Sequence, residues 1–118
     1  MSDRNESVLD FRGVLAQLDA MVGRRVSVES GPADTGSFHE SRGVLGSPIE
    51  FEGEEAGSEN HEARVAFFLD NGEAQVVIRK RGLVRAEVYV LDLFQGPSRT
   101  VQIHYAGGVV LIVREELG

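Results

Sequence analysis

The strongest candidate for binding chemistry is a short run of basic residues in the second half of the chain. Its four members are Arg79, Lys80, Arg81 and Arg85. Guanidinium and ammonium groups contact phosphates and carboxylates, so this basic run is a candidate contact for an acidic protein or a nucleic acid. No aromatic residue lies among the four, so stacking of nucleic-acid bases is not indicated. The alternative interpretation is an exposed strand end whose charges meet only water.

Oxygen ligands for a divalent cation are concentrated in residues 47–62, which hold six glutamates and no base. The alternating Asp/Asn ligands and fixed glycine of an EF-hand are absent, so we interpret this segment as a long, solvated acidic loop. The three histidines, His39, His61 and His104, are scattered and lack metal-binding spacing. The sequence therefore predicts no metal site and no cofactor.

Covalent catalysis has little support in the residue types. The chain has no cysteine, which excludes thiol nucleophiles, disulfides and Cys-ligated zinc. No Gly-x-Ser-x-Gly elbow marks a serine nucleophile. Gly107-Gly108 lies between two predicted strands, without the following helix whose N-terminus would bind a phosphate. We therefore assign no catalytic residue.

The charge of the chain is unevenly distributed. The net charge is −7 over 118 residues, but residues 1–62 carry −8 and residues 63–118 carry +1. This overall acidity opposes non-specific binding to nucleic acid. No apolar run approaches the ~20 residues of a membrane span, and no charged-then-apolar leader is present. We expect one cytoplasmic domain over residues 1–118, without a membrane partner.

The first element that could position these residues is an amphipathic helix over residues 8–22. Its apolar side chains recur at spacings of three and four: Val8, Phe11, Leu15, Leu18 and Val22. Such a pattern places them on one helix face. Ser7 resembles a capping residue, and Gly23 is a natural stop.

After Gly23 the apolar period changes from 3.6 to 2, which predicts strands. Asn71-Gly72 is a strong signal for a tight hairpin between two of them. The predicted strands are Arg25–Ser30, His39–Gly46, Ala63–Asp70, Glu73–Lys80, Leu83–Phe94, Arg99–Tyr105 and Val109–Arg114. Short antiparallel strands with tight turns indicate a barrel or a strongly bent sheet.

Three of these strands are apolar on both faces, at residues 65–69, 88–91 and 109–113. A solvated antiparallel sheet should have one polar face, so something must cover them. One helix is ~10 Å wide and three strands span roughly 14 Å, so the helix alone is too narrow. We predict a homo-oligomer formed through a strand face or edge. The alternative is a folded sheet covered by the helix and the acidic loop.

A helix followed by bent antiparallel strands resembles the Sm-like small barrels of the SH3-like group. The resemblance rests on residues 22–28, with alternating valines, and on Arg42-Gly43-Val44-Leu45, which look like the first motif of that family. The second motif of the family is replaced by Ala106-Gly107-Gly108. The resemblance implies a mainly β fold, with the N-terminal helix followed by a small antiparallel SH3/Sm-like barrel of six or seven strands over residues 24–114. It also implies ring assembly through strand edges, but not RNA binding.

These observations predict a non-enzymatic binding or assembly module that self-associates. The first alternative is a small-ligand-binding protein or enzyme with its pocket at the barrel mouth, under the 47–62 loop. A pocket that gathers His39, His104 or Tyr105 with buried carboxylates would favour the enzyme. The third hypothesis is an RNA-binding Sm-like protein that uses Arg79, Lys80 and Arg81.

Overall fold

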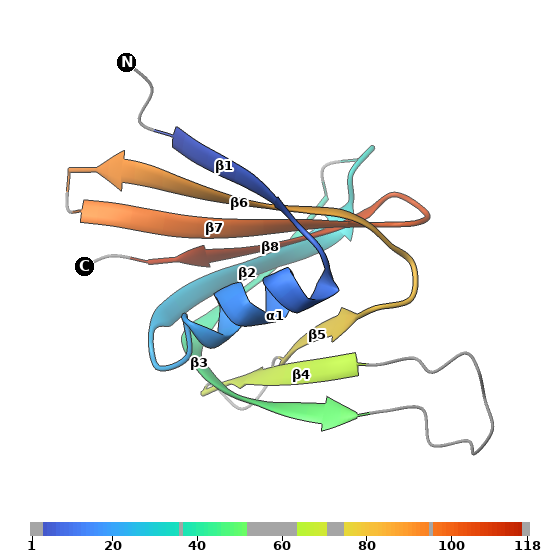
Figure 1. Cartoon of the computed structure of the whole chain (residues 1–118), viewed down its shortest axis with the longest axis horizontal. Helices are drawn as coiled ribbons and strands as arrows, with labels where there is room; N and C mark the ends of the chain where they lie inside the picture. Colours follow the sequence, from blue (N-terminus) through green and yellow to red (C-terminus); the bar gives the residue numbers. More distant parts are fainter. Residues whose placement is uncertain (1–3, 36, 52–63, 71–74, 95, 117–118) are drawn as a thin grey trace.

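The structure of the protein, a computed structural model, describes residues 4–35, 37–51, 64–70, 75–94 and 96–116. These residues form one α-helix and eight strands (Figure 1). In chain order the elements are β1 (Arg4–Leu9), α1 (Phe11–Asp19), β2 (Arg25–Pro32), β3 (His39–Phe51), β4 (Arg64–Leu69), β5 (Gln75–Arg79), β6 (Leu83–Leu93), β7 (Gly96–Tyr105) and β8 (Val109–Glu115).

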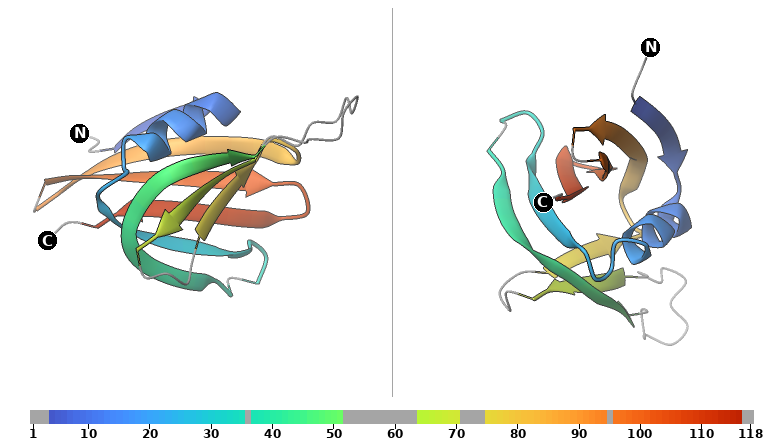
Figure 2. Two further views of the ribbon diagram at one scale, coloured as in Figure 1. Left: turned by 90° about the horizontal axis from the view of Figure 1, so that it is seen from below. Right: turned by 90° about the vertical axis from the view of Figure 1, so that its left-hand side faces the viewer.

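All described strand pairs are antiparallel, and the strands follow one another in the order β1-β6-β7-β8-β2-β3-β4-β5. The mainly β class with a helix near the N-terminus is therefore confirmed. The sheet is rolled, but its two edge strands, β1 and β5, do not pair with each other (Figure 2). The expected closed barrel of six or seven strands is thus an open roll in which the structure describes eight.

The N-terminal part of the chain differs from the expected 8–22 helix, because a strand precedes a shorter helix. Residues 4–9 pair with β6 from Leu91 to Ala86. The Asp10 side chain accepts a hydrogen bond from the Gly13 amide at 2.7 Å and caps α1, the role expected of Ser7. Pairing with a strand 77 to 87 residues away in the sequence leaves no trace in a local helical period, so the helix was predicted to begin three residues too early.

Removing this cap should weaken the helix measurably. We expect Asp10→Ala to lower the free energy of unfolding by about 1 kcal/mol, because one amide in the first turn loses its acceptor. Asp19→Ala is the matched control: it removes an exposed carboxylate from the other end of α1, where the helix dipole disfavours negative charge. Urea unfolding should show a lower midpoint for the first variant only. Equal losses would contradict the capping role of Asp10.

Strand β3 continues through the sequence at which the prediction ended it. The expected acidic loop over residues 47–62 is therefore wrong at its start, since residues 47–51 belong to β3; residues 52–63 lie outside the described residues. The register with β4 shifts between Leu45 and Pro48, and a bulge of this kind accommodates a proline within a sheet. A Cβ atom at Gly46 would lie 2.9 Å from the Phe68 carbonyl oxygen, so glycine permits the close approach of the two strands.

The concave side of the roll contains the core. Helix α1 contributes Val14 and Leu18, and Met21 follows just after its end; none of the three is exposed. The helix packs on β1, β6 and β7, and its other side lies near β3 and β4, so it occupies the opening of the roll (Figures 1 and 2). The other fully buried large side chains come from the strands: Phe67, Leu45, Ile78, Ile103, Val26, Val76, Val101 and Val113.

The three strands that are apolar on both faces differ in how well their outer faces are covered. On β8, Val110 is 4% exposed and Ile112 is half-buried beside Phe38. On β6, the outer face carries the half-buried ring of Tyr89. On β4, Phe68 is 43% exposed. Rolling of the sheet therefore accounts for the inner faces of these strands, while Phe68 stays exposed on the outer face of β4. Among the described residues, no helix is long and apolar enough to cross a membrane.

Candidate functional site

The basic run predicted from the sequence is divided between two places. Arg79 ends β5, and Arg81 lies in the turn after it; both line one cavity. Lys80 is exposed and does not line that cavity. Arg85 lies on β6, where its Nε is 2.6 Å from Oε2 of Glu87. The structure thus brings Arg79 and Arg81 to one candidate site and assigns Arg85 to an ion pair.

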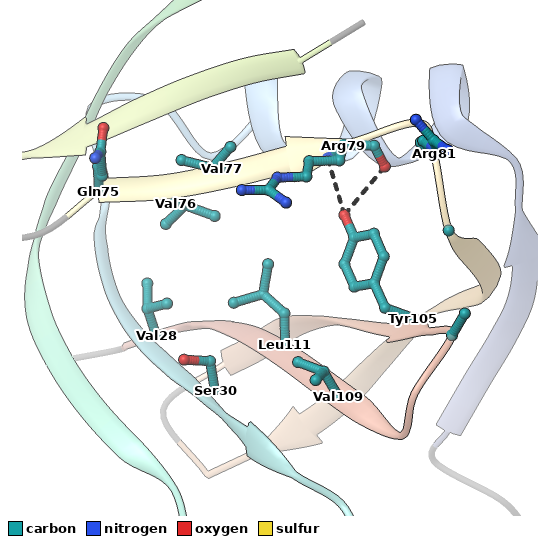
Figure 3. A pocket seen from close by; sticks show the side chains of 12 residues that line it. Val28, Ser30, Gln75, Val76, Val77, Arg79, Arg81, Tyr105, Val109 and Leu111 are labelled. Atoms are coloured by element: carbon teal, nitrogen blue, oxygen red, sulfur yellow. Dashed lines mark hydrogen bonds between the residues drawn. The ribbon is translucent and has the colours of Figure 1, made fainter. Parts of the chain in front are cut away.

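Tyr105, the last residue of β7, links this site to the rolled sheet. Its hydroxyl accepts a hydrogen bond from the Arg79 amide at 3.0 Å and donates one to the Arg79 carbonyl at 3.2 Å (Figure 3). Burial raises the pKa of Tyr105 above its ordinary value, against the opposing effects of the Arg79 hydrogen bond and charge. The hydroxyl therefore stays protonated and can donate and accept at once.

The turn between β5 and β6 is fixed to the same end of β7. The Ala106 amide donates to the Gly82 carbonyl at 2.7 Å, and Gly82 has a φ of 83°, a left-handed conformation that favours glycine. A Cβ atom at Gly82 would lie 3.9 Å from the Tyr105 ring. These contacts hold Arg79 and Arg81 beside the inner face of the sheet.

A cavity of about 580 Å³ lies between β5 and the inner faces of β2, β7 and β8. We call it the β5 groove. Its lining is mainly aliphatic, with Tyr105 at one end, and its residues are Val28, Ser30, Gln75, Val76, Val77, Arg79, Arg81, Gly82, Tyr105, Ala106, Val109 and Leu111. Figure 3 shows the Arg79 side chain extending from the Tyr105 hydroxyl back along β5, above Leu111. A cavity of this size suits a small ligand or a short stretch of chain.

A second polar cluster lies on the outer face of β6 and β7. Glu87 is 7% exposed, and it accepts a hydrogen bond from the Tyr89 hydroxyl at 2.8 Å and pairs with Arg85. His104 Nε2 lies 3.6 Å from Glu87 Oε1. Burial of Glu87 opposes its ionisation, but the Tyr89 hydrogen bond and the charges of Arg85 and His104 outweigh burial and lower its pKa.

This lowered pKa makes a pH-dependent contribution to stability. The carboxylate contributes stability above the unfolded-state pKa of about 4.5, and that contribution is lost as the pH falls through the lower folded-state pKa. We therefore expect wild type to be more stable than Glu87→Gln near neutral pH. The difference in free energy of unfolding should shrink between about pH 5 and pH 3. Urea unfolding across this range measures it.

Tyr89→Phe is the matched variant for this measurement, since it removes one hydrogen bond to Glu87 and keeps the Arg85 pair. It should reduce the pH-dependent difference without abolishing it. A difference between wild type and Glu87→Gln that stays constant with pH would contradict the proposed source of stability.

The other candidates from the sequence are not brought together. His39 is exposed at the start of β3, His104 lies on the outer face, and His61 lies outside the described residues, as do most of the glutamates of the acidic segment. The buried carboxylates, Glu87 and Glu115, do not line the β5 groove. No group of three metal-ligating side chains occurs among the described residues. The combination that would favour an enzyme is therefore absent from the groove, apart from Tyr105.

Sequence analysis named Tyr105 only as a candidate pocket residue of an enzyme, and it gave Glu87 no role. Tyr105 carried a signal, because it continues the inward alternation of Val101 and Ile103 and is the one polar member. Glu87 interrupts an apolar strand, which is the usual sign of a paired charge. The partners of both residues lie at positions that only the strand register reveals.

Known proteins offer no guide to function, so the geometry of the β5 groove is the basis for a functional assignment. No protein-family model matches the chain, and neither the curated proteins nor the solved structures yield a significant match.

Proposed function

We propose that this protein is a non-enzymatic binding module and that the β5 groove is its binding site. The observation that carries the proposal is one cavity with an aliphatic floor and a cationic rim: Val28, Val109 and Leu111 form the floor, and Arg79 lies at the rim. Among the described residues, no carboxylate pairs with Arg79. A ligand with an apolar body and an anionic group complements this arrangement.

Titration with small carboxylic acids tests this proposal. The probes are hexanoate and phenylacetate, each compared with its neutral amide, and the readout is the amide chemical shifts of the ¹⁵N-labelled protein. We expect shifts confined to the groove and at least threefold tighter binding of each acid than of its amide. The acids should gain because the guanidinium of Arg79 forms a charge-assisted hydrogen bond.

The basic run supplies its own control for this titration. Arg79→Gln should abolish the preference for the acid, whereas Lys80→Gln removes the adjacent cation outside the groove and should leave the preference intact. Shifts elsewhere on the molecule, or equal loss in both variants, would overturn the proposed site.

We propose self-association as a second function, through the outer face of β3 and β4. Ile49 and Phe68 are 49% and 43% exposed and lie on the same side of these strands, since Ile49 is paired with Ala66 and Phe68 follows two positions later. Apolar side chains of this size on an open sheet face suit contact with a second copy.

We also keep the resemblance to Sm-like small barrels as a proposal. The two segments that carry it run side by side, with Val26 paired to Gly43, and both belong to the bent part of the sheet. A Cβ atom at Gly43 would lie 2.7 Å from Oδ1 of Asp70, and this oxygen accepts the Val44 amide at 2.9 Å. The glycine of the motif thus permits the close contact between β3 and the residue that follows β4.

A further inference from the structure

The main chain of β5 has polar groups that its partner strand does not use. In an antiparallel pair, residues alternate between those that bond to the partner strand and those whose amide and carbonyl point away. Both the amide and the carbonyl of Arg79 bond to the Tyr105 hydroxyl, so Arg79 is of the second kind. The register with β4 has no irregularity, so Val77 and Gln75 are of the second kind too.

These groups face a groove rather than another strand. Among the described strands, β5 is the last of the sheet, and Gln75, Val77 and Arg79 all line the β5 groove. The tyrosine hydroxyl takes the position at Arg79 that a partner strand would otherwise occupy, and it leaves Val77 and Gln75 open. The edge from Gln75 to Arg79 spans roughly 13 Å, the length of a short strand.

Three features of the groove suit an extended peptide. The outward amides and carbonyls of β5 offer main-chain hydrogen bonds, and the valines and Leu111 of the floor offer contacts to apolar side chains. Arg79, the last residue of β5, offers a cation whose side chain extends back along β5 above Leu111. Peptides that add a strand to a sheet edge use the same combination of main-chain bonds and side-chain pockets.

We propose that β5 accepts an extended peptide of another protein as an added antiparallel strand. The peptide pairs with Val77 and Gln75, places apolar side chains on the floor of the groove, and carries an acidic side chain that meets Arg79. This inference rests on the proposed function and names the class of its ligand. The acidic residue lies at the amino-terminal end of the added strand, because antiparallel strands run in opposite directions and Arg79 is the last residue of β5.

A second copy of β5 is a poorer occupant than a foreign peptide. Its sequence, Gln-Val-Val-Ile-Arg, has no carboxylate to meet Arg79. An antiparallel β5–β5 pair centred on Val77 would place Arg79 of each copy opposite Gln75 of the other. Pairing would then require both copies to break the hydrogen bonds between Arg79 and Tyr105.

The test uses a blocked five-residue peptide, a glutamate followed by alternating valine and threonine, acetylated and amidated. Titration into the ¹⁵N-labelled protein should shift the amides of Gln75 and Val77 downfield, as new hydrogen bonds do. Two methylated peptides test the main-chain hydrogen bonds. Methylation of two alternate peptide amides that face β5 should weaken binding at least tenfold. Methylation of the two amides that face away from β5 should weaken it less than threefold. Replacing glutamate by glutamine should weaken binding threefold to tenfold in wild type but not in Arg79→Gln.

The outcomes separate this inference from the proposed function. If both methylated peptides bind as well as the parent, strand addition is wrong, while the acid titration can still support the groove as a binding site. If neither the peptide nor the small acids shift groove amides, both proposals are wrong. A further peptide has glutamine in place of glutamate, and its only carboxylate is a free C-terminus. If it binds more tightly than the parent peptide, the antiparallel orientation is wrong.

Val77→Pro tests the edge from the side of the protein. The Val77 amide points away from β4, so proline removes no hydrogen bond of the β4–β5 pair and is tolerated at such edge positions. We expect the variant to keep its circular dichroism spectrum and to lose peptide binding at least tenfold. Retained peptide binding would overturn the inference.

Discussion

Phe67→Ala should destabilise the protein by about 3–5 kcal/mol, whereas Phe68→Ala should cost less than about 1 kcal/mol. The two residues are neighbours on β4 and have the same side chain. Phe67 is 1% exposed and points into the core beside Leu15 and Val65; Phe68 is 43% exposed on the opposite face. The first substitution leaves a large cavity in the core, and the second removes a side chain that water already reaches.

Urea unfolding of both variants measures this difference, with circular dichroism as the signal. Such a loss at Phe67 is a large part of the roughly 5–15 kcal/mol that stabilises a typical domain, so the urea midpoint should fall clearly. Equal destabilisation by the two substitutions would contradict the assigned faces of β4.

The same pair of variants tests self-association. If the outer face of β4 forms the contact between copies, Phe68→Ala should raise the dissociation constant at least tenfold in sedimentation at micromolar concentration. Val84→Ala is the control and should leave the dissociation constant unchanged, because Val84 is also an exposed apolar side chain, 66% exposed, but lies on β6. A strictly monomeric wild type would rule out assembly at this face.

The sequence predicted that the face of β4 occupied by Phe68 is apolar, but not that it is the outer face. A run such as Val65-Ala66-Phe67-Phe68-Leu69 states that both sides of a strand are apolar, and the structure agrees. The sequence does not show in which direction the sheet curves. This direction decides which face of each strand lies in the core. Long-range pairing decides it: β2 pairs with both β3 and β8 and so joins the strands on the two sides of α1 into one sheet.

The strands with local signals were the ones predicted well. The β4–β5 register is centred on residues 71 and 72, as the Asn71-Gly72 signal requires, although that turn lies outside the described residues. The errors occurred where non-local contacts override local preference. β1 exists because β6 offers it an edge, and β3 passes Pro48 because a bulge relieves the missing amide.

The candidate site was predicted in composition but not in arrangement. The sequence identified Arg79, Lys80, Arg81 and Arg85 as one group. A β-turn and a bulge then separate them, since the register between β6 and β7 shifts around Val84 and turns Arg85 toward Glu87. Tyr105 lies 26 residues from Arg79, and only the rolled sheet makes them hydrogen-bonded neighbours.

Leu18→Ala should cost about 2–5 kcal/mol, because Leu18 is wholly buried where α1 occupies the opening of the roll. Arg12→Ala, on the exposed side of the same helix, should change the free energy of unfolding by less than about 0.5 kcal/mol. The comparison separates the contribution of core packing from any general weakening of the helix. Alanine favours the helix at least as well as leucine or arginine, so helix propensity accounts for neither result.

Hydrogen exchange then tests whether α1 closes the roll or merely rests on one side of it. The helix packs on β6, and it lies near β3 and β4 through Leu15 and Ala16. If it joins the two sides, Leu18→Ala should accelerate amide exchange in β4 and in β6 together, beyond the uniform change that lower global stability brings. Acceleration in β6 alone would mean that β4 and β5 are held by β3 only. The β5 groove would then owe its shape to the Arg79–Tyr105 hydrogen bonds rather than to the helix.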